Sequence, residues 1–266
     1  MPEVTSYPNG KPSWLDLGTT DLGGAEKFYG GMFGWSASRE PAGEGMVYSM
    51  QTIGGKSVAG IYNQRPEQKA AGMPPMWLTY ITVDDIDATA AKVAPAGGSV
   101  MQEPMDVMDV GRMALIVDPS GGVVALWQAN KHIGSELSGE DGTFAWTELI
   151  STDPDKAEAF LVEVLGIETV PMPDAPGGYK LLMVNGEPGG GLMLRPEEIG
   201  DVPSHWMNYF QVDDAQASAD TAVALGGKVL MPPFDTGGPG IVAVLQDPQG
   251  AVFSVIKPNL EYNPFA

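Results

Sequence analysis

Two tryptophans each precede an acidic residue by two positions: Trp14 precedes Asp16, and Trp146 precedes Glu148. Side chains two residues apart on a β-strand share a face, so each carboxyl group would lie beside an indole ring. An apolar neighbour removes water from a carboxylate and raises its pKa toward values useful for general acid–base catalysis. These two pairs are therefore the first candidates for chemistry.

Tyrosines on two other strands could complete such a site. Tyr80 and Tyr209 could each donate a hydrogen bond to a developing oxyanion. The predicted catalytic candidates are accordingly Asp16, Glu148, Tyr80, Tyr209 and His205. The competing interpretation is structural, because an inward carboxylate paired with an arginine or a backbone amide is the commoner arrangement. Both interpretations stay open at this point.

Composition excludes several other classes of function. The 266 residues contain no cysteine and two histidines, so the sequence offers no thiolate nucleophile and no Ser-His-Asp arrangement. The net charge of −20 repels phosphate backbones and anionic lipids, so we expect neither nucleic acid nor membrane partners. No signal sequence or long apolar run is evident, which favours a cytoplasmic protein.

The candidate residues lie within an internal repeat. PSWLDLGTTD (12–21) corresponds to FAWTELISTD (144–153), and YITVDDIDATAAKV (80–93) corresponds to YFQVDDAQASADTA (209–222). The turns that begin at Asp118-Pro119 and Asp247-Pro248 keep the same spacing. The repeat predicts an N-terminal domain at 1–130, a linker at 131–143 and a C-terminal domain at 144–266.

Each predicted domain contains two similar modules, at about 12–65 and 76–130 and at about 144–197 and 205–258. A strand, an aspartate cap and a helix occur at 13–33 and again at 77–97. Asp21 and Gly34 bound a helical pattern of apolar residues, and Asp153 and Gly166 bound another. Three strand candidates follow each helix, for example 46–53 and 57–63, so every module reads as βαβββ.

This order resembles the vicinal-oxygen-chelate superfamily, which includes glyoxalase I, extradiol dioxygenases and bleomycin-resistance proteins. The resemblance rests on the FYGGMFGW helix, the VDDIDA and VDDAQA helix starts, and the DPSG and DPQG turns before the last strands. The resemblance covers nearly the whole chain. Within the superfamily, the sequence is most similar in type to the tandem-domain glyoxalase-like proteins of actinobacteria. The implied fold class is α+β, with two domains that each form a cupped mixed sheet with helices outside.

The resemblance also implies a test for a metal site, since enzymes of this superfamily hold a divalent ion with His, Gln and Glu on the cup's inner strands. The corresponding positions hold none of these residue types; they are Trp14, Leu78 and Ala125 in the first half, and Trp146, Met207 and Ser254 in the second. None is a ligand for such an ion. We therefore expect no metal and no other cofactor, with a displaced site at His205 and Glu148 as the alternative.

Without a metal, two functions remain. In the first, the inward residues Trp14, Leu78, Trp127, Trp146, Met207 and Ser254 bind a planar, partly apolar small molecule such as a natural product or antibiotic. In the second, a cofactor-free enzyme of lyase, isomerase, cyclase or hydroxylase-like type acts on a secondary metabolite through Asp16 and Glu148. The structural alternative to both is that the aromatic rings have no ligand and pack in the cups as part of the hydrophobic core.

We favour the binding function and expect a monomer or homodimer with a small-molecule ligand or substrate. His132 falls in the predicted linker and is expected to be exposed.

Overall fold

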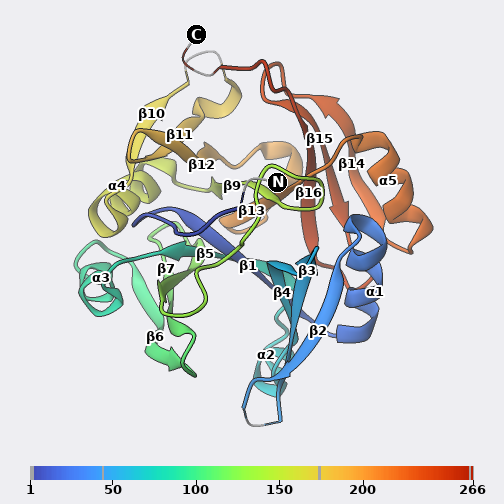
Figure 1. The fold of residues 1–266 in the computed structure, drawn as a ribbon. Helices are drawn as coiled ribbons and strands as arrows, with labels where there is room; N and C mark the ends of the chain where they lie inside the picture. Colours follow the sequence, from blue (N-terminus) through green and yellow to red (C-terminus); the bar gives the residue numbers. More distant parts are fainter. Residues whose placement is uncertain (1–2, 44, 173–174, 264, 266) are drawn as a thin grey trace.

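The computed structural model describes residues 3–43, 45–172, 175–263 and 265, which fold into two eight-stranded mixed sheets (Figure 1). The first sheet has the order β2-β3-β4-β1-β5-β8-β7-β6, and the second has the equivalent order β10-β11-β12-β9-β13-β16-β15-β14. The strands of the first sheet are β1 (Pro12–Thr19), β2 (Ser36–Pro41), β3 (Val47–Ile53), β4 (Lys56–Asn63), β5 (Met76–Thr82), β6 (Ser99–Val107), β7 (Gly111–Val117) and β8 (Val123–Ala129). Those of the second are β9 (Phe144–Ser151), β10 (Glu168–Pro171), β11 (Lys180–Val184), β12 (Glu187–Leu194), β13 (His205–Gln211), β14 (Lys228–Asp235), β15 (Gly240–Gln246) and β16 (Val252–Pro258).

The helices follow the predicted modules. They are α1 (Leu22–Phe33), α3 (Ile86–Val93), α4 (Pro154–Leu165) and α5 (Ala215–Ala224), with a short α2 (Pro66–Ala70) and two 3₁₀ turns, η1 (Pro176–Gly178) and η2 (Glu197–Ile199). The α+β class and the βαβββ order are confirmed. No helix of the described ranges is long and apolar enough to cross a membrane.

The predicted helix ends are also confirmed. Asp21 accepts a hydrogen bond from the Gly24 amide at the start of α1, and Asp153 accepts one from the Lys156 amide at the start of α4. Gly34 and its counterpart at 166 end these helices in the left-handed conformation, which glycine adopts without steric cost.

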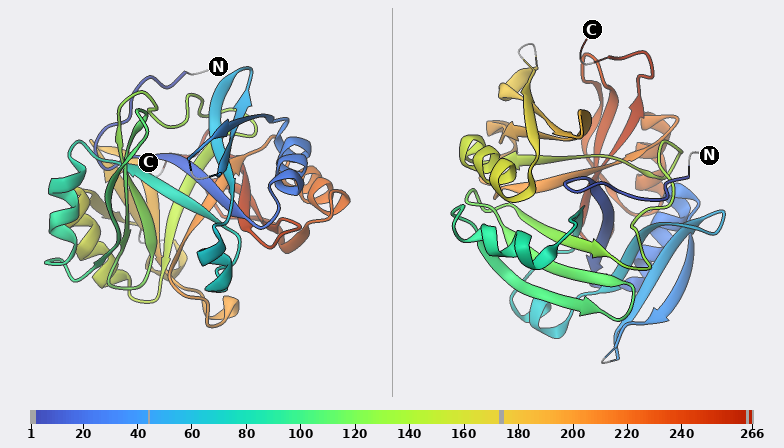
Figure 2. Two further views of the ribbon diagram at one scale, coloured as in Figure 1. Left: turned by 90° about the horizontal axis from the view of Figure 1, so that it is seen from below. Right: turned by 60° about the vertical axis from the view of Figure 1, so that its left-hand side comes forward.

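Each half of the chain shares its helix-side core with the other half. Helix α1 lies beside α5, and α3 lies beside α4 (Figures 1 and 2). One core cluster joins β1 and α1 to β13, β15, β16 and α5, and a second joins β5, β7, β8 and α3 to β9, β12 and α4. The first module therefore packs on the fourth, and the second module packs on the third.

Helices α1 and α4 each pack a phenylalanine against a glycine of the other half of the chain. The Phe28 ring of α1 lies over Gly227, and the Phe160 ring of α4 lies over Gly98. A Cβ added at Gly98 would come within 2.5 Å of the Phe160 ring and 2.6 Å of the Val117 carbonyl oxygen. Only glycine allows this approach of helix to turn.

The two sheets also meet back to back at their central strands. The Thr79 hydroxyl on β5 donates to Asn208 Oδ1 on β13 at 2.8 Å, and it lies 3.3 Å from the Thr147 hydroxyl on β9. All three side chains are buried. Since neighbouring residues on a strand point to opposite faces, Tyr80 and Glu148 point away from this contact, into two separate cups.

We predict that Gly98→Ala and Gly227→Ala each lower the free energy of unfolding by about 1–3 kcal/mol, because the added methyl group overpacks a junction between the halves. Urea or thermal unfolding measures the change. Gly23→Ala in helix α1 is the matched control. The added Cβ would meet no atom closer than 3.8 Å, and alanine favours the helical conformation. Equal stability of all three variants would contradict the shared-core interpretation.

Candidate functional site

The first cup contains a buried carboxyl group that accepts three hydrogen bonds. Asp16 on β1 accepts from Trp14 Nε1 at 2.9 Å, from the Tyr48 hydroxyl at 2.5 Å and from the Tyr80 hydroxyl at 2.8 Å. The sequence pattern placed Trp14, Asp16 and Tyr80 together. Tyr48 was missed, although its alternation with Met50 in the strand VYSMQTI was a usable signal.

The second cup repeats this arrangement with a longer acidic side chain. Glu148 Oε1 on β9 accepts from the Tyr209 hydroxyl on β13 at 2.5 Å, and Tyr179 forms a second hydrogen bond to the same carboxyl group. The indole Nε1 of Trp146 donates to the Tyr179 hydroxyl at 3.0 Å. Tyr179 is the counterpart of Tyr48 and was also missed, because it lies in a Gly-rich connection with no strand periodicity.

Glycines make room for both missed tyrosines. A Cβ added at Gly60 on β4 would come within 1.8 Å of the Tyr48 hydroxyl oxygen, and one at Gly191 on β12 would come within 2.0 Å of that of Tyr179. A glycine inside a strand often marks such a close approach. Each tyrosine can therefore lie over the glycine of the neighbouring strand and reach the carboxyl group.

Burial governs the electrostatics of both carboxyl groups. Burial raises the pKa of Asp16 and of Glu148, and their hydrogen bonds with tyrosine hydroxyls partly oppose that shift. Their hydrogen-bond partners in the described structure are phenols and an indole, rather than the arginine or backbone amide of the competing interpretation. The carboxyl groups therefore lack a compensating positive charge.

His132 covers the first cup. Its ring packs edge-to-face against Trp14, with 4.4 Å between ring centroids, and lies 5.9 Å from the Trp127 ring centroid. Trp127 Nε1 also donates to the His132 carbonyl oxygen at 2.8 Å. Burial lowers the pKa of His132 to about 4, so the imidazole is neutral at pH 7. The expectation that His132 is exposed was wrong, because the segment after β8 folds back over the sheet.

The aromatic floor of the first cup is accordingly core. Trp14, Tyr80 and Trp127 are 3%, 6% and 5% exposed, and Leu78 packs against them. Ala125 pairs with Tyr80 beneath this cluster. For the first half, the interpretation of the rings as packing describes the structure.

The second cup is more open. Ile256 replaces Trp127, and Glu261, which is exposed, stands where the repeat has His132. Trp146 and Tyr209 remain half-buried, whereas Glu148 is 7% exposed and Met207 is 9% exposed. Ser254 is buried and pairs with Tyr209, in the place of Ala125.

The residues at the expected metal positions do not fit a divalent ion. The inner strands bring Trp14, Leu78 and Ala125 together in one cup, and Trp146, Met207 and Ser254 in the other. His205 lies opposite Ile150 at the rim, and its Nδ1 faces the Pro203 carbonyl oxygen at 2.8 Å rather than Glu148. Within the described ranges no group of three or more His, Cys, Asp or Glu side chains is placed to hold a metal.

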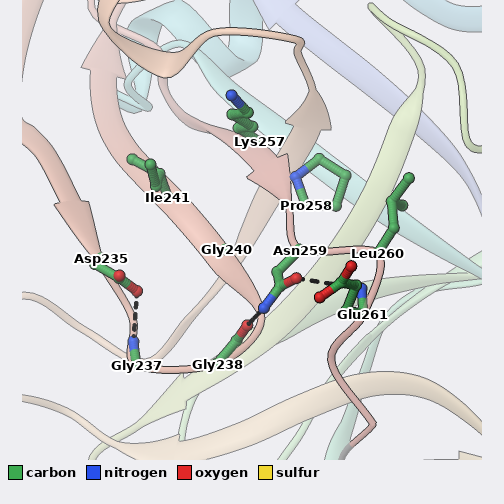
Figure 3. Close-up of a pocket in the computed structure, with 10 residues that line it drawn as sticks. All are labelled: Asp235, Gly237, Gly238, Gly240, Ile241, Lys257, Pro258, Asn259, Leu260 and Glu261. Carbon is green, nitrogen blue, oxygen red and sulfur yellow. Dashed lines mark hydrogen bonds between the residues drawn. The ribbon is translucent and has the colours of Figure 1, made fainter.

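Two surface hollows lie outside both cups. The larger, of about 630 Å³, is formed by the β14–β15 loop, Ile241, Lys257 and the segment Asn259–Glu261 (Figure 3). The second adjoins it at the start of helix α5. Lys257 follows the alternation of Phe253 and Val255, which face the helices, so these hollows belong to the helix side of the sheet.

Comparison with known proteins accounts for the fold. Residues 11–126 and 143–255 each match the family described as Glyoxalase/Bleomycin resistance protein/Dioxygenase superfamily. The "Putative glyoxylase CFP32" of Mycobacterium tuberculosis is 48% identical over 260 residues, which cover 97% of this chain and 98% of that protein. "Anthracycline biosynthesis protein DnrV" of Streptomyces peucetius is 35% identical, and the match covers 96% of this chain and 95% of that one.

Solved structures share the architecture at low identity. The Mn(II)-bound glyoxalase from Novosphingobium aromaticivorans superposes with a TM-score of 0.65 at 16% identity, covering 94% of this chain and 82% of that one. The 2,3-dioxygenase LapB from Pseudomonas sp. KL28 gives 0.64 at 17% identity, with 96% of each chain covered. With its repeated cupped sheet and both halves matched, this chain belongs to the glyoxalase/bleomycin resistance protein/dioxygenase superfamily.

Proposed function

We propose that this protein binds a planar, partly apolar small molecule in its C-terminal cup, without the metal of its enzymatic relatives. The observation that carries the proposal is the contrast between equivalent rings. Trp146 and Tyr209 stay half-buried. Their counterparts Trp14 and Tyr80 are buried, because the His132 ring packs on Trp14 and the Trp127 ring packs on Tyr80. A half-buried indole beside a buried polar group is the usual make-up of a small-molecule site.

Methionines give the walls of this cup the capacity to adapt. Met183, Met193 and Met207 alternate along their strands with residues of the helix-side core or of the sheet-to-sheet contact, so they point into the cup. An unbranched thioether repacks around a flat ligand at little cost. The names of the anthracycline-biosynthesis relatives support a polycyclic natural product as the ligand class.

A second candidate function is catalysis without a cofactor. It is favoured by the raised pKa of Glu148, which makes this group a better proton donor near neutral pH, with Tyr209 and Tyr179 beside it. The two functions separate by product analysis. A binding protein returns its ligand unchanged, whereas an enzyme converts many equivalents.

We predict opposite effects for the two equivalent tryptophans. Trp146→Ala should weaken binding of a planar aromatic metabolite by about tenfold or more, since one lost stacking contact with its buried area exceeds 1.4 kcal/mol. Its stability should fall only modestly. Trp14→Ala removes a core ring and should cost about 3–5 kcal/mol of unfolding free energy while leaving affinity nearly unchanged.

Ligand titration and thermal unfolding of both variants provide the measurements. A large loss of stability in Trp146→Ala, together with no ligand from a broad aromatic library, would contradict the proposal for this cup.

Metal content provides an independent test. We predict well under one equivalent of Zn, Fe, Mn or Ni per chain in protein purified without an affinity tag, because Trp, Leu, Ala, Met and Ser occupy the ligand positions. Elemental mass spectrometry checks this. A stoichiometric metal that is lost in both His205→Ala and Glu148→Gln would establish the displaced site instead.

A further inference from the structure

The carboxyl group of the C-terminal cup has acceptor capacity that its own chain leaves unused. In the first cup, Asp16 accepts from two phenols and from the Trp14 indole. The Trp14 N–H also reaches the Tyr48 hydroxyl at 2.9 Å, and the equivalent bond from Trp146 to Tyr179 is kept in the second cup. The second cup lacks the indole bond to the carboxyl group, so the described partners of Glu148 are two phenols. A carboxylate offers about four acceptor positions, more than these two phenols occupy.

Among the residues that the structure describes, no positive charge neutralises this carboxyl group. The pKa of Glu148 reflects burial and its bonds with Tyr209 and Tyr179, with no cationic side chain of the described residues contributing. A buried carboxylate without a counter-charge is costly, so the group either takes up a proton or pairs with a cation.

The lysines and arginine of the second half are all engaged or placed elsewhere. Lys156 and Lys180 form ion pairs with carboxylates of helix α4 and its cap, and Arg195 forms one with a nearby loop. Lys228 begins an exposed edge strand, and Lys257 lies on the helix side of β16. In the part of the chain that the structure describes, the C-terminal cup is thus lined by aromatic rings, thioethers, Ile256, the Ser254 hydroxyl and the carboxyl group of Glu148.

These groups select a ligand by its charge. Aromatic faces attract cations through their negative quadrupole, and the effect increases where water is excluded. A carboxylate in the same pocket adds a charge-assisted hydrogen bond, and a net charge of −20 raises the local concentration of cations. An anionic ligand would meet only repulsion.

We propose that the C-terminal cup is selective for planar molecules that carry a protonated amine, with Glu148 as the group that receives the amine and Trp146 and Tyr209 as the rings beside it. This inference rests on the proposed binding function and narrows it to a class of ligand. Binding should strengthen as pH rises through the titration of Glu148, because the cation favours the ionised carboxylate.

Three planar probes of similar size test the charge preference at pH 8: 9-(aminomethyl)anthracene as the cation, 9-methylanthracene as the neutral molecule and anthracene-9-carboxylate as the anion. Equilibrium dialysis against the full chain measures their affinities. We expect the cation to bind at least tenfold more tightly than the neutral probe, and the anion more weakly than both. Because a buried pair is poorly screened, most of the preference should persist in 0.5 M NaCl.

Glu148→Gln tests the assignment to this residue. It should abolish the cation preference while retaining the neutral probe, since glutamine keeps the shape and an acceptor oxygen for the tyrosines. Glu163→Gln, at an exposed position of α4, makes the same change in net charge and should leave the preference intact.

Each other result is decisive. Equal binding of cation and neutral probe, a preference that survives Glu148→Gln, or one that vanishes in salt would overturn the inference and leave the proposed binding function standing. Failure of all three probes and of a broad planar library to bind would overturn the binding function itself.

Discussion

The structure depends on the packing of helix α1 against the second half of the chain and of helix α4 against the first half. Phe28 of α1 packs at Gly227, and Phe160 of α4 packs at Gly98, so each helix-side core is built from both sheets. Tyr29 adds a polar link, since its hydroxyl donates to Asp247 in the turn before β16. Because neither half buries its helices alone, the relative position of the two sheets is fixed by close packing rather than by a flexible tether.

That arrangement leaves both concave faces pointing outward, away from the Thr79–Asn208 contact. The two cups therefore lie on separate faces, while the cores between the sheets are shared. Their carboxyl groups keep the same relation to two tyrosines and a tryptophan, yet their surroundings differ. The segment that continues from β8 lays His132 on the first cup, whereas the equivalent chain after β16 leaves Trp146 half-buried. The same repeat thus buries Trp14 in the first cup and leaves its counterpart Trp146 half-buried in the second.

The hydrogen-bond networks in the cups explain how a buried carboxyl group is tolerated without a cation. Asp16 is satisfied by three neutral donors and acts as a polar centre of a packed core. In the second cup the Trp146 indole donates to Tyr179 and not to Glu148, whose carboxyl group has Tyr209 and Tyr179 as partners. The residues at the family's metal positions do not suit a divalent ion in either cup.

The sequence by itself determined the duplication, the module order and the helix ends, because repeats, strand alternation and capping residues are local signals. Asp21 with Gly34 and Asp153 with Gly166 bound their helices as local chemistry requires. Alternation along β1 and β9 also placed Asp16 and Glu148 beside the tyrosines of β5 and β13. Only the tertiary structure decided which cup is filled. The fold-back of His132 over Trp14, and the reach of Tyr48 and Tyr179 past Gly60 and Gly191 of the neighbouring strands, act through contacts between distant segments. No local pattern encodes such contacts, since they depend on how the whole sheet curves and where the connecting chain returns.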